Sequence, residues 1–371
     1  MKLETSVQKL TLEDNRRIIA VSDIHGHCSY LKKLLKKVKF SSKDELFLLG
    51  DYIERGLENI EALRYVMNLS KRPNVHALCG NMDAFTAQII DGTSRLKPEE
   101  VLARIRHMEE KHGSCLISQM CLESDISLEA VSEIGKVMKQ LSRLYCRELD
   151  FIYSLPTVIE TQGFIFAHGG IPVDDMDRVE KLKPFKIMKY DAFMDKGLKF
   201  SKYVITGHWP TILYRIFPMC SPLYNHADHI VDIDGGCGVK EFGQLNALIV
   251  PNVYSQEFSY EMVDSFRTFT AKYPQEDNDA RVNLVWGDNK VDIVTSGRKT
   301  SIVRRISDGA TFEVPTSYVY NDGEDIRCED FNNYLLPVQP GDKLKLVKEV
   351  PGFGRLVKRE STFGWYRQKT R

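Results

Sequence analysis

Side chains that bind metals follow directly after short apolar runs of this chain. Residues 18–21 lead into Asp23 and His25, and residues 46–49 lead into Asp51. Asp23 and His25 are two residues apart, so both side chains project from the same side if the strand continues through them. Carboxylate oxygens with an imidazole nitrogen suit borderline divalent ions such as manganese, iron or zinc, and a carboxylate can bridge two of them. The pattern predicts a centre that holds two metal ions.

Three more residues that can bind a metal ion also follow directly after short apolar runs. Asn81 follows the apolar run 75–79, His168 follows residues 164–167, and His208 follows residues 203–206. In a parallel α/β sheet, ligands bind beyond the carboxyl ends of the strands. All six side chains are therefore expected at one edge of the fold.

The intervening segments have the patterns of the elements that must position these side chains. Residues 29–38, with Ser29 as N-cap, and residues 57–69 predict amphipathic helices between three strands, which is typical of a parallel α/β sheet. Residues 97–121 and 127–150 have helical periodicity and predict a helical cap over one rim of the site. The remaining runs predict a second sheet; they are residues 157–160, 164–167, 203–206, 230–233 and 245–250.

The motifs around these residues resemble those of the calcineurin-like metallophosphoesterases, in the branch of the serine/threonine protein phosphatases and the symmetrical diadenosine-tetraphosphatases. The resemblance covers roughly residues 16 to 262, and Trp209-Pro210 after His208 points to that branch. It implies a two-sheet sandwich flanked by helices, and it makes Arg55 a phosphate clamp, for which a planar guanidinium is well shaped. It also implies one metal on Asp23, His25 and Asp51, and the other on Asp51, Asn81, His168 and His208.

Two positions depart from the pattern of that family. Met82 stands where the family has the histidine that donates a proton to the leaving group, and Glu54 replaces the aspartate that orients this histidine. Loss of a general acid costs about 10² to 10⁴ in rate on esters with poor leaving groups. Asp83, His27 or a metal-bound water could take its place, and Asp83 is predicted as the catalytic candidate.

The C-terminal part has a different pattern. Residues 263–312 predict a linker with short strands, and residues 313–371 predict a small all-β barrel that resembles the Src-homology-3 type. Residues 341–371 hold nine Lys/Arg and three Asp/Glu, which favours a solvated surface over contact with an anionic partner. A protein partner is expected for the barrel. The chain thus divides into a catalytic domain at 1–262, with the cap at about 84–150, a linker and a barrel.

Composition limits where the chain works and what it binds. The 51 basic and 51 acidic residues cancel, which argues against nucleic acid as the main partner. No apolar run reaches the length of about 18 that a membrane span needs, and the first residues do not form a secretory signal. Eight cysteines without a Cys-x-x-Cys pair fit reduced thiols. We therefore expect a cytoplasmic protein with no membrane partner.

The sequence favours a phosphohydrolase with two divalent ions, manganese first and iron or zinc as alternatives. Its expected substrate is a phosphorylated protein or a small phosphomonoester, cleaved by metal-activated water. Two alternatives stay open. One is hydrolysis of a dinucleoside polyphosphate such as diadenosine tetraphosphate, and the other is a weakly active, metal-binding regulatory protein whose barrel recruits a partner.

Overall fold

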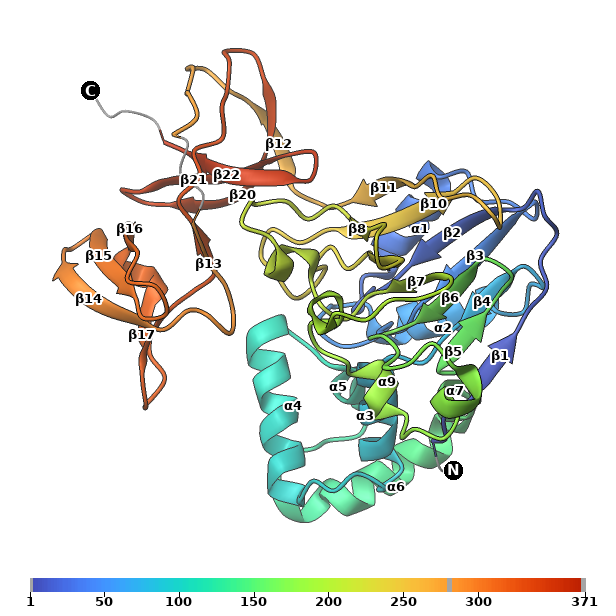
Figure 1. The fold of residues 1–371 in the computed structure, drawn as a ribbon. Helices are drawn as coiled ribbons and strands as arrows, with labels where there is room; N and C mark the ends of the chain where they lie inside the picture. The colour runs from blue at the N-terminus through green and yellow to red at the C-terminus, as the bar shows by residue number, and fades with distance from the viewer. Residues whose placement is uncertain (1–2, 279–281, 368–371) are drawn as a thin grey trace. The chain divides into compact units, whose positions relative to one another are not determined.

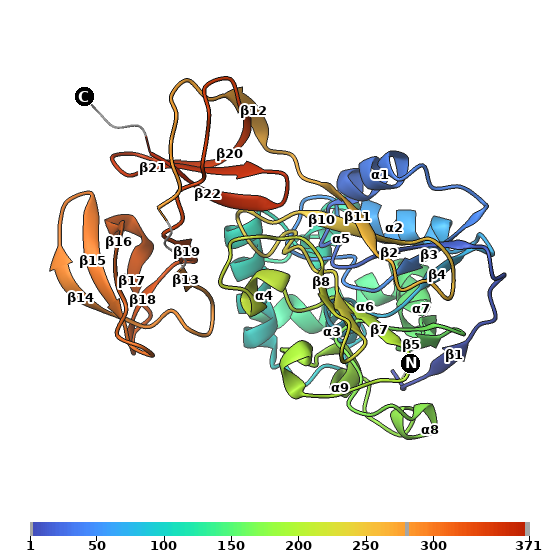
Figure 2. The same ribbon diagram turned by 45° about the horizontal axis from the view of Figure 1, so that its top comes forward.

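The structure is a computed structural model that describes residues 3–278 and 282–367. The chain divides into two compact units, each of which is described by itself. The first unit comprises residues 1–210 and 221–264, and the second comprises residues 211–220 and 265–371. Figures 1 and 2 show the strands and helices of both units from two directions.

The first unit contains a five-stranded sheet with the order β11-β10-β2-β3-β4. Strands β2, β3 and β4 run parallel to one another, as the alternation of strands and helices predicted. Strand β10 was expected in the second sheet, but it pairs antiparallel with β2 and so belongs here. The bounds of these strands are β2 Arg17–Val21, β3 Asp44–Leu48, β4 Val75–Ala77, β10 Leu245–Val250 and β11 Ser259–Val263.

A second sheet of six strands has the order β1-β5-β6-β7-β9-β8. Its central strands β6, β7 and β9 are parallel, while β5 and β8 run antiparallel to their neighbours. The bounds of these strands are β1 Val7–Lys9, β5 Val158–Glu160, β6 Phe164–Ala167, β7 Tyr203–Thr206, β8 Leu223–Asn225 and β9 Ile230–Asp232.

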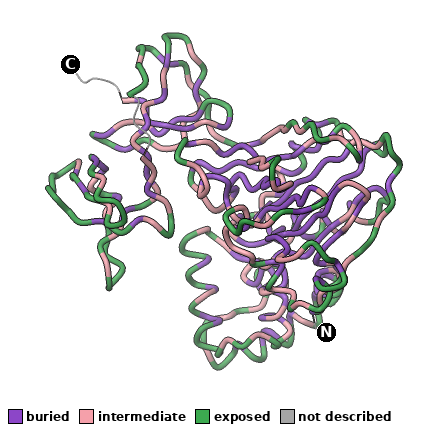
Figure 3. The backbone as a smooth tube through the Cα atoms, viewed as in Figure 1, coloured by how far each residue is buried: buried purple, intermediate pink, exposed green. Residues whose placement is uncertain are grey.

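The two sheets pack face to face through alternate side chains of their strands. Phe47 of β3 stacks on Phe166 of β6, with ring centroids 3.8 Å apart, inside an apolar cluster that both sheets share. The intervening residues point to the outer faces, such as Leu46 in β3 and Ile165 in β6, where helices cover them. Figure 3 shows the resulting burial along the central strands. Period-two burial on both faces fixes the register of the strands and so the position of each strand end.

Helices cover the outer faces of both sheets and form the predicted cap. Helix α1 begins at Cys28, with His27 rather than Ser29 in the N-cap position. The first helix expected for the cap, over residues 97–121, is divided in two. Gly113 ends α4 in a left-handed conformation, and Ser124 ends the following helix α5. The helix bounds are α1 Cys28–Lys37, α2 Asn59–Leu69, α3 Asn81–Ile90, α4 Pro98–His112, α5 Leu116–Glu123, α6 Ile134–Leu144, α7 Cys146–Ser154, α8 Met176–Val179 and α9 Phe185–Met188.

The second unit is all-β outside two short 3₁₀ turns, η3 (Thr211–Tyr214) and η4 (Thr316–Tyr318). A closed barrel of the Src-homology-3 type is not confirmed, because the described strands form four separate antiparallel sheets of four, three, two and two strands. The strand bounds are β12 Arg267–Thr270, β13 Asn283–Leu284, β14 Val291–Ser296, β15 Thr300–Arg305, β16 Thr311–Pro315, β17 Val319–Asn321, β18 Ile326–Cys328, β19 Phe331–Asn332, β20 Lys343–Val350, β21 Gly354–Arg359 and β22 Thr362–Tyr366.

Residues 211–220 belong to the second unit although they lie within the catalytic segment of the sequence. Asn283 donates hydrogen bonds from Nδ2 to the carbonyls of Arg215 and Ile216, and the amide of Cys220 donates to Ser361 at 2.9 Å. Nothing in the composition of this segment distinguishes it from a surface loop, so sequence reasoning did not separate it from its surroundings.

Candidate metal centre

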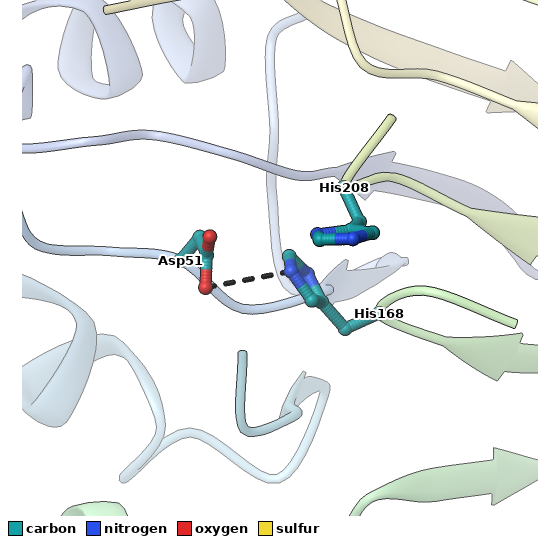
Figure 4. A group of neighbouring side chains, drawn as sticks. All are labelled: Asp51, His168 and His208. Atoms are coloured by element: carbon teal, nitrogen blue, oxygen red, sulfur yellow. Dashed lines mark ion pairs between the residues drawn. The ribbon is translucent and has the colours of Figure 1, made fainter. Parts of the chain in front are cut away.

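The structure brings the predicted ligand side chains together beyond the carboxyl ends of β2, β3, β4, β6 and β7. Asp23, His25 and Asp51 form one group whose ligand atoms lie within 4.8 Å of one another, and Asp51, His168 and His208 form another. Figure 4 shows the second group, with Asp51 facing the two imidazoles. Asp51 is the member that both groups share.

Asp51 directs its two carboxylate oxygens toward different histidines. Its Oδ2 lies 3.8 Å from Nε2 of His25, and its Oδ1 lies 3.4 Å from Nε2 of His168. Asp23 completes the first group, with Oδ1 3.7 Å from Nε2 of His25. A carboxylate with one oxygen in each of two ligand groups has the geometry of a bridge between two cations.

Asn81 reaches the second group from the start of helix α3. Its amide oxygen lies 3.0 Å from Nε2 of His168. Gly80, just before it, cannot carry a side chain, because a Cβ there would lie 2.1 Å from the backbone nitrogen of Asp51 and 2.2 Å from its Oδ1. This close approach of the two loops is what places Asn81 beside Asp51.

Backbone carbonyls orient two of the imidazoles. Nδ1 of His25 donates to the carbonyl of Ile53 at 3.2 Å, and Nδ1 of His168 donates to the carbonyl of Leu49 at 2.8 Å. Each bond turns Nε2 toward the carboxylates, so that this nitrogen is the one that would bind a metal ion. Such a hydrogen bond on the remote nitrogen is the usual support of a metal-binding histidine.

His208 is oriented by Asp191, a residue that sequence reasoning missed. Nε2 of His208 lies 2.7 Å from Oδ1 of Asp191, which leaves Nδ1 available toward the centre. Asp191 lies between α9 and the 3₁₀ turn η2 (Phe193–Lys196), with no motif around it. The backbone amide of His208 donates to Oδ2 of Asp23 at 2.9 Å, which joins the two ligand groups.

The ligand residues hold an uncommon backbone conformation. Asp23, His25, Asp51 and His208 all have positive φ angles, of 56°, 46°, 53° and 70°. A left-handed conformation costs a residue with a Cβ roughly 1 kcal/mol or more. Such backbone strain concentrates at functional sites, where the surrounding structure enforces it.

The electrostatics of the buried cluster match the needs of cations. Burial opposes ionisation of Asp51, but the imidazoles of His168 and His25 outweigh it and lower its pKa. Burial also disfavours the His168 imidazolium, yet the carboxylates of Asp51 and Asp23 raise its pKa to about 10. Burial lowers the pKa of His25 to about 4. The buried carboxylates thus attract positive charge, and the donor set of oxygens and imidazoles fits two divalent ions.

Arg55 lies on the loop that follows Asp51, again with a positive φ of 65°. Its Nε is buried and has no hydrogen-bond partner among the described residues. A guanidinium held without an acceptor beside a candidate metal centre has the chemistry expected of a phosphate-binding group.

The position of the missing proton donor is apolar. Met82 is 8% exposed, and its backbone amide donates to Oδ1 of Asp51 at 2.8 Å. Glu54 is 2% exposed and accepts a hydrogen bond at Oε1 from the hydroxyl of Thr86, one helical turn after Met82. Burial raises the pKa of Glu54. Neither side chain reproduces an imidazole aimed at a substrate.

Both carboxylate oxygens of Asp83 accept hydrogen bonds from backbone amides. Its Oδ2 accepts from the amides of Asp51 and Gly80, and its Oδ1 accepts from the amide of Tyr52, at 2.8 to 3.0 Å. Burial and the Asp51 carboxylate raise its pKa to about 7. Both oxygens thus help to position the ligand loops, and the proton-donor role of Asp83 stays a prediction.

The other histidines lie in different settings. Nδ1 of His27 contacts the carbonyl of His25 at 2.6 Å, and His76 pairs with Glu45. In the turn between β8 and β9, His226 bonds the hydroxyl of Tyr203, and His229 bonds the carbonyl of Phe200. These four side chains therefore have local structural partners.

The chain matches a known family over most of its first unit. A family model described as calcineurin-like phosphoesterase matches residues 16–225. A symmetrical bis(5'-nucleosyl)-tetraphosphatase of Serratia proteamaculans is 31% identical over 143 residues, 36% of this chain and 49% of that protein. Another, of Actinobacillus pleuropneumoniae, is 33% identical over 92 residues, 24% and 33% of the two chains. The chain thus spans about half or less of the length of these relatives.

Solved structures of phosphatases were also found. A protein serine/threonine phosphatase of Saccharomyces cerevisiae is 13% identical, with 71% of this chain and 85% of that chain covered and a TM-score of 0.41. Separately, the helices in the described part of this chain include none that is long and apolar enough to cross a membrane.

Proposed function

The chain belongs to the calcineurin-like phosphoesterase family, and on that premise we propose that it is a phosphohydrolase that uses two divalent metal ions. The observation that carries this proposal is the placement of Asp51, whose two oxygens face separate donor groups. Manganese is the first choice of metal, with iron and zinc as alternatives, because the donors are oxygens and imidazole nitrogens.

Each residue of the centre has a proposed task. Asp23, His25 and Asp51 would hold one ion, and Asp51, Asn81, His168 and His208 the other. When bound, the ions would supply Lewis-acid activation of the phosphoryl group and of water. Arg55 would bind the phosphoryl oxygens, and Asp191 would keep the His208 imidazole in its orientation.

The proposed substrate is a phosphorylated protein or a small phosphomonoester. A second candidate, a dinucleoside polyphosphate, is supported by the names of the curated relatives and by Met82. The phosphoanhydride of such a substrate releases a phosphate oxygen that departs as an anion, so a protonating residue matters less than for an alkyl ester.

The test is a profile of metal content and substrates on the purified full chain. We expect about two equivalents of metal by elemental analysis and hydrolysis of p-nitrophenyl phosphate with manganese. Comparison of a phosphoserine peptide with diadenosine tetraphosphate then decides between the substrate classes. A metal-loaded protein without turnover on any of them would favour the third candidate, a metal-binding regulatory protein.

We also propose a protein partner for the second unit and a cytoplasmic location. Several apolar side chains of β14 and β15 are exposed to solvent, including Ile293 at 43%, Val294 at 52% and Ile302 at 42%. Exposed apolar groups that gather on one small sheet are a common feature of interaction surfaces. Replacement of these three residues by serine should leave hydrolysis of a small substrate unchanged while it weakens a partner complex isolated by crosslinking.

A further inference from the structure

The loop between β7 and β8 begins with a proposed metal ligand and then leaves the first unit. Only Trp209 and Pro210 separate His208 from residue 211, where the segment that belongs to the second unit starts. The ring of a proline fixes its φ angle, so this short connection has little conformational freedom. The position of the His208 backbone therefore depends on how residues 211–220 are held.

Two carbonyls of this segment accept hydrogen bonds from one side chain of the second unit. Asn283, in the short strand β13, donates from Nδ2 to the carbonyl of Arg215 at 2.9 Å and to that of Ile216 at 2.6 Å. Its own carbonyl accepts from Nη1 of Arg305 at 2.6 Å, and its backbone pairs with that of Asn332. Asn283 is thus fixed by its neighbours and holds the chain just after the η3 turn.

Further contacts within the second unit hold the rest of the segment. The ring of Phe217 lies against that of Tyr334, with centroids 5.3 Å apart. The amide of Cys220 donates to the carbonyl of Ser361 at 2.9 Å. Residues 215–220 are therefore held along their length by the second unit.

His208 has less support from the sheets than the other two imidazoles. His25 and His168 bond to carbonyls of the loop after β3, whereas the partner of His208 is the partly exposed side chain of Asp191. His208 also has a positive φ of 70°, a strained conformation that the surrounding chain must enforce. A change in the segment that follows should therefore shift His208 before it shifts the other two imidazoles.

We propose that Asn283 is a positioning residue for His208. It holds the carbonyls of residues 215 and 216, and the short connection through Trp209 and Pro210 passes this restraint to the ligand. The inference rests on the proposed phosphohydrolase function, in which His208 binds one of the two ions. Metal binding, and turnover with it, thus depends on the second unit, although every proposed ligand lies in the first.

The experiment measures the manganese affinity of the full chain by competition with a chelator. Asn283→Asp keeps the size of the side chain but places an acceptor, in place of a donor, opposite two carbonyls. We expect affinity for one of the two ions to fall about tenfold, as when the support of a metal ligand is lost, and affinity for the other to change less than about twofold. Phe217→Ala, which removes a partly exposed ring, should act in the same direction with a smaller loss.

The matched control is Asn289→Asp, at another asparagine of the second unit. Nδ2 of Asn289 donates to the carbonyl of Cys328, which lies outside the segment 211–220. This substitution disturbs the second unit in a similar way without releasing the segment. We therefore expect it to leave both metal affinities unchanged.

A double-mutant cycle separates positioning of His208 from a general loss of stability. In the His208→Ala background, Asn283→Asp should have no further effect on metal affinity, because the residue through which it acts is absent. In the His25→Ala background, which weakens the other ion, the loss of about tenfold should persist.

The outcomes separate the two levels of the argument. Wild-type protein that binds no divalent ion, or that binds ions without hydrolysing any phosphate substrate, would overturn the proposed function, and this inference with it. Active wild type combined with folded Asn283→Asp and Phe217→Ala variants that bind both ions like wild type would overturn the positioning role alone.

Three further results would also overturn the positioning role, because each indicates general destabilisation. They are equal weakening of both ions, a loss of the same size in Asn289→Asp, and a further loss in the His208→Ala background. Folding of every variant is checked by thermal unfolding, and if Asn283→Asp does not fold, the comparison of Phe217→Ala with wild type decides.

Discussion

The two sides of the candidate centre are built in different ways. On the metal side, the proposed ligands lie just beyond strand ends, and each of the three imidazoles has a hydrogen-bonded support. On the side of the leaving group, Met82 is buried and Glu54 turns toward Thr86, so these two positions offer no imidazole there. The proposed metal ligands thus depend on the strand ends of the two sheets, whereas neither Met82 nor Glu54 supplies an imidazole on the side of the leaving group.

The largest expected effect comes from the residue that joins the two metal groups. Asp51→Asn should reduce kcat/KM and metal affinity by more than about 10²-fold, since loss of a residue that only supports a ligand already costs 10- to 100-fold. Asp44→Asn serves as control, because it removes another buried carboxylate of the same sheet, one that pairs with Arg17. Near-normal metal content in Asp51→Asn, by elemental analysis, would show that this carboxylate does not bridge.

A substitution of Arg55 tests whether this side chain binds the phosphoryl group on the metal side of the centre. Arg55→Lys keeps the charge but loses the planar pair of donors, so we expect kcat/KM to fall about 10²-fold on every phosphate substrate, as when one transition-state donor is removed. Metal content should not change. A loss confined to phosphoserine would instead assign Arg55 to the side of the leaving group.

Asp191 should matter for metal binding alone. Asp191→Asn leaves His208 with a weaker partner at Nε2, so affinity for one of the two ions should fall about tenfold, measured by competition with a chelator. At saturating metal most of the activity should return. Asp195→Asn, an exposed neighbour, is the control, and equal metal affinity in the two variants would remove Asp191 from the centre.

The smallest effect is expected from restoring the family pattern on the side of the leaving group. Met82→His combined with Glu54→Asp should raise the phosphoserine rate about tenfold and leave the aryl phosphate rate nearly unchanged. An equal gain on both substrates would mean that the new imidazole does not protonate the leaving group.

Sequence reasoning located the strand-end loops because burial on both faces fixes strand positions, and the ligands follow the strands directly. It placed β10 in the wrong sheet, since an apolar run does not reveal which neighbour it pairs with. It also missed Asp191, which reaches His208 only through the packing of the segment after α9, at a distance from the motifs that no local pattern encodes. The same limit applies to the second unit, where alternating strands predicted a barrel but the pairing produced separate sheets.

The left-handed conformations at Asp23, His25, Asp51 and His208 bear on how this protein tolerates mutation. Glycine adopts such angles without steric cost, so glycine at one of these positions should relieve local strain while it removes a proposed ligand. A library screened for heat resistance alone would then enrich inactive variants at the centre. A library screened for turnover would retain the residues that make the fold less stable. Positions that are enriched in one screen and depleted in the other would then identify the centre.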